Sequence, residues 1–226
     1  QEEEAKTSKE MNDSDYESMI AGNLTKEEMQ FVLAYGPQEM TENSLSETDY
    51  TLILNTLTQA PNESGSYIEE YDPDSNWKSV FSLTDTNRLF SSFTDYRFTE
   101  ENDTDTENGI DVDGEYIKFF PATLNYVATA TITSAEYTDE KMEIYFTFEK
   151  TTYDSGNKKT EKSDKLAVLK PNADGKYVIV EISQVSQTAQ ENSESQSAQT
   201  SSTEQSSQSE STASQSESSG KSIKDL

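Results

Sequence analysis

The chain contains no cysteine and no histidine among its 226 residues. Disulfide bonds, thiolate zinc sites, haem ligation by histidine and Cys or His catalytic pairs are therefore excluded within it. The absence of cysteine fits an exported bacterial domain better than a small secreted eukaryotic domain, which would more often carry disulfides.

Basic residues are also scarce, with 17 Lys and Arg against 44 Asp and Glu, and the formal net charge is −27. A chain of this charge repels nucleic-acid phosphates and anionic membrane surfaces, so no nucleic-acid partner is expected. The carboxylates promote solubility, and they leave basic ligands or divalent cations open as partners. No apolar run approaches the roughly 20 residues of a membrane-spanning helix, which predicts no transmembrane span.

Hydrophobic residues make up only 31% of the chain, and their shortage is concentrated at its two ends. Residues 1–23 are predicted to be a flexible polar leader, in which Tyr16 and Ile20 could instead dock a short helical turn. Residues 24–184 contain enough aromatic and aliphatic side chains for one domain. Residues 185–226 are rich in Ser and Gln and are predicted to be disordered, because they bury too little apolar surface to offset the entropy of ordering.

Capping signals followed by apolar residues at helical spacing predict three helices in the first half of the domain. The first is capped by Thr25, with Glu28 completing a capping box, and stops at Gly36. The second is capped by Ser46 and stops before Pro61. The third is shorter, and the sequence predicts Thr84 as its cap and a buried side made of Leu89, Phe90 and Phe93.

Beyond residue 124 the apolar period changes to two, which predicts antiparallel strands with one buried face. Turn signals at 153–159 and at Asp174-Gly175 separate the later strands. The fold class is therefore α+β, with N-terminal helices packed on an antiparallel sheet of about four strands. On the second of these strands, the side chains predicted to face the core are Met142, Ile144, Phe146 and Phe148.

The closing hairpin carries the run Asp174-Gly175-Lys176-Tyr177, followed by alternating Val and Ile up to Ile182. Together with the order of helices first and strands second, this resembles the nuclear-transport-factor-2-like (cystatin-like) cone fold over residues 24–183. The resemblance implies that the helices pack into the concave face of a curved sheet. That fold supports both enzymes and binding proteins, so it does not decide the function.

The polar leader, acidic body and Ser/Gln-rich end are similar to the mature part of a Gram-positive bacterial lipoprotein. The resemblance implies an extracytoplasmic protein that is anchored at the cell surface or secreted. Its membrane tether would be a lipidated cysteine, which would have to lie upstream of Gln1.

One candidate metal site lies in the acidic segment that follows the third predicted helix. Calcium takes six to eight oxygen ligands, and this segment could supply several of them. The spacing is not that of an EF-hand, because the required Gly and Glu positions are occupied by Asn108 and Gly114. A solvated acidic loop is the alternative. The candidate ligands are Asp103, Asp105, Asp111 and Asp113.

Two further groups of side chains are candidates for function. Tyr67, Tyr71 and Trp77 could stack on a sugar or grip a peptide, or they could simply pack over the core. Asp95 and Tyr96, followed by Arg97, could form an acid–base site, or an ordinary turn with a surface ion pair between Asp95 and Arg97.

No catalytic motif emerges, which favours a non-catalytic extracytoplasmic protein that binds a small ligand or a protein partner without a cofactor. One alternative is a cone-fold enzyme that uses a pocket Asp or Glu and a Tyr. Another is a calcium-binding accessory protein. A buried carboxylate in a deep pocket would favour the enzyme, whereas exposed aromatics in a shallow pocket would favour binding.

Truncation after Ser186 tests the predicted tail. We expect the melting temperature of the domain to be unchanged, because the removed segment contributes no packed core. Calorimetry of the full and truncated chains makes the comparison. Slow amide exchange within 187–220 of the full chain would contradict the prediction.

Overall fold

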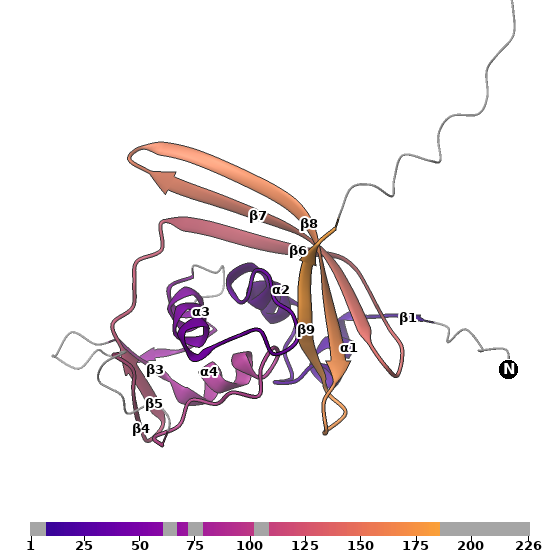
Figure 1. Cartoon of the computed structure of the whole chain (residues 1–226), viewed down its shortest axis with the longest axis horizontal. Coiled ribbons are helices and arrows are strands. Elements are labelled where there is room, and N and C mark those ends of the chain that lie inside the picture. Colours follow the sequence, from indigo (N-terminus) through magenta and orange to yellow (C-terminus); the bar gives the residue numbers. More distant parts are fainter. Residues whose placement is uncertain (1–7, 61–66, 72–78, 102–108, 186–226) are drawn as a thin grey trace, which may run out of the picture. The chain divides into compact units, whose positions relative to one another are not determined.

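A computed structural model describes residues 8–60, 67–71, 79–101 and 109–185 (Figure 1). The tail predicted from residue 185 lies outside these residues, apart from Val185 itself. The last strand ends at Gln184, where the sequence predicts the end of the domain. The described residues combine helices with antiparallel sheets, so the predicted α+β class is confirmed.

The described residues contain four helices, all in the first half of the chain: α1 (Asp13–Met19), α2 (Lys26–Tyr35), α3 (Glu47–Gln59) and α4 (Leu83–Phe90). Helices α2 and α3 begin with the predicted capping boxes, in which the hydroxyls of Thr25 and Ser46 accept hydrogen bonds from the backbone three residues ahead. These two boundaries are confirmed.

Helix α4 begins earlier than predicted, and the assignment of Thr84 as its cap is wrong. The cap is Ser82, whose hydroxyl accepts a hydrogen bond from the Asp85 N–H at 3.2 Å. Ser82 also ends a strand, so its backbone already has the extended conformation that an N-cap needs. The predicted buried side of the helix, with Leu89 and Phe90 fully buried, is confirmed.

Part of the predicted leader is folded. Strand β1 (Lys9–Glu10) pairs with the large sheet, and α1 follows behind a capping box at Asn12. Tyr16 and Ile20 are buried, and the Ala21 N–H donates to the Tyr177 carbonyl at 3.0 Å. The docked helical turn that the sequence allowed therefore replaces a flexible leader over the described residues from 8 to 23.

Besides β1, the large sheet contains β6 (Tyr126–Tyr137), β7 (Met142–Asp154), β8 (Asn157–Pro171) and β9 (Tyr177–Gln184). Its strand order is β1-β6-β7-β8-β9, and it is antiparallel throughout. Strands β7 and β8 are joined by a tight turn in which Ser155 and Gly156 both have positive φ. The four long strands predicted from the sequence are present, and the predicted β7 core face is fully buried.

A second antiparallel sheet was not predicted. Its strands, in the order β2-β3-β5-β4, are β2 (Glu70–Tyr71), β3 (Ser79–Ser82), β5 (Tyr116–Phe119) and β4 (Asp111–Asp113). Strand β4 lies in the segment expected to be an acidic loop. It forms because Ile110 and Val112 are buried and its backbone pairs with β5, whereas its carboxylates face outward.

Strand β6 contains a β-bulge between Ile132 and Ser134. Before the bulge the inward side chains are at even positions, such as Ala128 and Ala130, and after it the buried residue is Ala135. An apolar period of two cannot continue through such an insertion. The extra residue moves the inward-facing side chains from even to odd positions.

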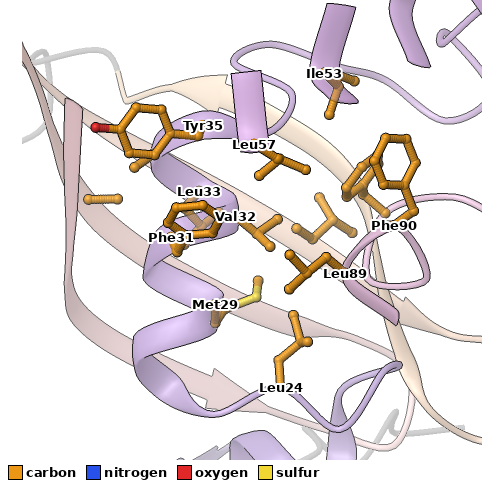
Figure 2. Packing of buried hydrophobic residues seen from close by; sticks show 14 of the residues in the cluster. Leu24, Met29, Phe31, Val32, Leu33, Tyr35, Ile53, Leu57, Leu89 and Phe90 are labelled. Atoms are coloured by element: carbon orange, nitrogen blue, oxygen red, sulfur yellow. The ribbon is translucent and has the colours of Figure 1, made fainter. Parts of the chain in front are cut away.

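Helix α2 is the most buried of the described helices. From Glu28 to Pro37 every residue except Gln30 is buried. Gln30 Oε1 accepts a hydrogen bond from the Ile132 N–H at 3.1 Å, and the Tyr35 hydroxyl accepts one from the Ala128 N–H at 2.9 Å. The helix thus satisfies donors along the outer edge of β6. Figure 2 shows its side chains converging with those of α3 and α4, among them Leu57, Leu89 and Phe90.

An ion pair connects the start of α2 to α4. Arg88 Nη2 lies 2.6 Å from Glu28 Oε1, while the other carboxylate oxygen of Glu28 accepts the Thr25 N–H. Burial by itself would raise the pKa of Glu28, but the bonds from Arg88 and Thr25 outweigh it, so the pKa is lowered. Gly22 allows the backbone before α2 to lie close to α4, since a Cβ on this residue would be 2.3 Å from the Arg88 carbonyl oxygen.

Replacing Phe146 with Ala should lower the free energy of unfolding by about 3–5 kcal/mol, because the ring is fully buried in the sheet–helix core. Glu149→Ala, at an exposed position of the same strand, should change it by less than about 0.5 kcal/mol. Urea unfolding of both variants makes the measurement. Equal effects would mean that the inward face of β7 is assigned incorrectly.

Arg88→Met should raise the Glu28 pKa and reduce stability at pH 7 by about 1–3 kcal/mol. The lowered pKa means that the pair stabilises the fold above the unfolded carboxyl pKa and that this contribution is lost as the pH falls through the folded value. The variant should therefore lose less stability than the wild type between pH 7 and pH 3. Carboxyl NMR titration and urea unfolding provide both readouts.

Lys141→Met is the matched control, because it removes the ion pair of an exposed lysine with Glu143. It should leave the Glu28 pKa unchanged and cost at most about 1 kcal/mol. An Arg88 variant with an unaltered Glu28 titration would rule out the proposed coupling.

Candidate functional site

A cleft of about 530 Å³ opens where the helical part of the domain meets the last two strands. It is bounded by residues 40–45 after α2, by Tyr50 of α3, by residues 93–96 after α4, and by the β8–β9 hairpin. A volume of this size lies in the range that accommodates small organic ligands.

The cleft exists because two loops are fixed to the outer edge of β9 at separate points. The Ile179 N–H donates to the Ser92 carbonyl at 2.8 Å, and Met40 and Ile182 exchange backbone hydrogen bonds of 2.9 and 3.2 Å. Val178 and Val180, on either side of Ile179, line the cleft floor. The backbone contacts therefore hold the walls apart by fixing each loop independently.

One wall is a pair of stacked tyrosines. The rings of Tyr50 and Tyr96 lie 4.4 Å apart at an interplanar angle of 18°. The Thr94 hydroxyl donates to the Tyr50 hydroxyl at 3.0 Å and accepts the Tyr96 N–H at 3.0 Å. Both rings are half-buried, so they present a fixed aromatic surface to the cleft.

The charged groups of the cleft lie at its rim. Lys170 Nζ is 2.8 Å from Glu42 Oε2, and both side chains are more than half exposed. Asp95 is exposed as well. Arg97 donates to the carbonyls of Thr94 and Tyr96 at 2.8 and 2.7 Å, so it stabilises the turn. No ion pair joins Arg97 to Asp95, in contrast to the surface pair considered from the sequence. The Asp95 carboxylate is therefore available to a ligand.

The aromatic residues singled out from the sequence lie elsewhere. Tyr67 packs edge-on against Phe31 with ring centroids 4.8 Å apart, and is half-buried at the core. Tyr71 is exposed on β2, where its ring meets that of Tyr116 at 4.7 Å. Neither lines the cleft, and Trp77 lies outside the described residues. From the sequence, Tyr50 was only a helix-face residue, and Tyr96 was considered with Asp95 as a possible acid–base site. Nothing local in the sequence indicates that the two rings stack.

Of the candidate calcium ligands, Asp111 and Asp113 occupy alternate positions of β4. Lys118 lies 2.8 Å from Asp113 and lowers the pKa of its carboxyl through a hydrogen bond and its charge. Asp103 and Asp105 lie outside the described residues. No group of three acidic side chains arranged to hold a metal ion occurs in the part of the chain that the structure describes.

A buried lysine lies on the inner face of β8. Lys165 Nζ donates to the Gln38 carbonyl at 2.9 Å and lies 4.6 Å from the centroid of the Phe148 ring. Burial lowers its pKa, and nearby Lys150 lowers it further, although Glu39 acts in the opposite direction. These contacts attach the segment after α2 to the sheet, which is a structural role beside the cleft wall at Met40.

The chain matches no protein-family model, and it has no significant match among curated proteins or solved structures. Within the described residues, no helix combines the length and the apolar character needed to span a membrane.

Proposed function

We propose that this protein is a non-catalytic binding protein that takes a small ligand into the cleft beside β9. The observation that carries the proposal is the stacked pair of Tyr50 and Tyr96, held by Thr94 and facing a floor of Val178 and Val180. The lining combines these apolar side chains with polar ones such as Asn43 and Asn172. Small-molecule sites likewise pair an apolar surface with polar groups that orient the ligand. The exposed Asp95 carboxylate at the rim favours a ligand that carries a positive charge or several hydroxyls.

The position of the carboxylates supports binding over catalysis. A carboxyl group that acts as a general acid near neutral pH usually needs burial to raise its pKa. The described carboxylates that line the cleft, Glu42 and Asp95, are both exposed, and Glu42 is paired with Lys170. The buried Glu28 lies outside the lining and is paired with Arg88. A carboxylate–tyrosine enzyme is therefore the less favoured alternative.

We also propose that the helices lie against the concave face of a cone-like sheet and that the protein works outside the cytoplasm, tethered by a lipid. The shared core formed by the buried side chains of α2 and the inward side chains of β6 and β7 supports the first part. The lack of cysteine and the polar, acidic composition support the second. The tether would be a lipidated cysteine upstream of Gln1.

The cleft can be tested with a panel of methyl glycosides, free amino acids and primary amines, monitored by amide NMR of the full chain. Binding probes should shift the amides of Asn43, Asp95 and Val178. Val178→Trp should abolish these shifts by filling the floor of the cleft. Val127→Trp, at an exposed position on β6, is the matched control and should preserve them.

Asp95→Asn refines the same experiment. Loss of amine binding with retained glycoside binding would show that the rim carboxylate selects charge. Probes that shift only amides distant from the cleft, or that bind equally to the Val178 variant, would contradict the proposed site. Turnover of any probe that stops in the Asp95 variant would favour the enzyme instead.

A further inference from the structure

Strand β8 has an outer edge that is only partly covered. It pairs with β7 as far as Asn157, but it pairs with β9 only from Lys165 onward. Among the described residues, the last bond on the β9 side joins the Val185 N–H to the Asp164 carbonyl at 2.9 Å. Among the described residues, no strand lies beside residues 157–163 on that side, and Figure 1 shows the β7–β8 hairpin continuing past the end of β9.

The direction of the backbone groups along this edge follows from the ladder. In an antiparallel strand, alternate residues direct their N–H and C=O to the same side. Since the Asp164 carbonyl faces the β9 side, the backbone groups of Lys162, Thr160 and Lys158 face it too. The 2.9 Å contact between the hydroxyls of Thr160 and Thr151 agrees, because side chains approach closely in such non-hydrogen-bonded pairs.

A second contact on the opposite strand gives the same assignment. The Tyr153 N–H donates to the Asn125 carbonyl at 2.8 Å, which directs the backbone of Tyr153 away from β8. Its partner in the ladder is Lys158, so Lys158 must direct its own backbone away from β7. The edge thus offers three donors and three acceptors in one row.

The charge of this hairpin differs from that of the chain. Residues 157–163 carry three lysines and one acidic residue, in a protein whose net charge is −27. The exposed Glu149 of β7 lies opposite Lys162 in the ladder. Lys158 and Lys162 are exposed, and neither forms an ion pair within the described residues, whereas Lys159 lies 2.5 Å from Glu161. An anionic partner repelled by the rest of the surface would meet positive charge here.

We propose that this edge binds an extended acidic segment of another protein, which adds to the large sheet as a further strand. The segment would exchange backbone hydrogen bonds with Lys158, Thr160 and Lys162. Because side chains alternate along a strand, acidic residues four positions apart would lie opposite the two lysines on one face, with a β-branched residue opposite Thr160. The exposed ring of Tyr153 adds apolar contact on the same face.

A second copy of this chain is a poorer occupant. Antiparallel pairing of two such edges centred on Thr160 would place Lys158 of one copy opposite Lys162 of the other. Like charges directly opposite each other destabilise a strand pair. The lysines could also act only to prevent edge-to-edge association, and the experiment must separate that role from recruitment.

The probe is the acetylated and amidated peptide TETVTET, compared with TKTVTKT, each added to the full chain. The acidic peptide should slow hydrogen exchange at the amides of Lys158, Thr160 and Lys162 and leave the cleft amides unshifted. The double variant Lys158→Glu, Lys162→Glu should weaken its binding about tenfold or more, because two charge pairs are reversed, and should bind the basic peptide instead.

Lys9→Glu with Lys141→Glu is the matched control, because it changes the net charge equally at exposed sites distant from the edge in the strand ladder. It should retain the preference for the acidic peptide and the pattern of protected amides. Absence of protection, equal binding of both peptides, or equal losses in the two double variants would overturn the proposal. Unchanged peptide binding combined with self-association of the edge variant, measured by sedimentation, would show that the lysines only guard the edge.

Discussion

The fold depends on the burial of helix α2 on nearly all its sides. A helix buried in this way needs cover from several elements, and the α1 segment, α3, α4 and the large sheet all contribute side chains to the core around it. Several of its polar groups bind neighbouring elements or its own first turn. Glu28 binds Arg88, Gln30 and Tyr35 cap the edge of β6, and Thr25 satisfies the first turn. The position of α2 therefore fixes the helices relative to the sheet.

The cleft and the basic edge arise from the same arrangement at opposite ends of the β8–β9 pair. Near the β8–β9 turn, the edge of β9 is occupied by short backbone contacts from the helical half, and the gaps between them become the cleft. At the other end β9 stops, and β8 continues without a described neighbour on that side. The first gives a concave aromatic site suited to a small ligand, and the second a linear array of backbone groups suited to a strand.

Features encoded by neighbouring residues could be predicted from the sequence. The caps at Thr25 and Ser46 and the inward face of β7 depend on spacings of two to four residues. The small sheet could not be predicted, because β4 and β2 are too short for a period to emerge. The cleft was missed for a different reason. Tyr50 and Tyr96 become neighbours only when α3 and the turn after α4 meet, and no local pattern reports that contact.

The attachments along β9 also bear on how the chain reaches its native state. Ala21, Met40 and Ser92, all from the first half of the chain, hydrogen-bond to a strand that ends at Gln184. The core around α2 thus stays open during synthesis until the C-terminal strand has left the ribosome, and contacts between such distant segments form slowly. The domain can therefore complete its structure only after its last strand has been synthesised.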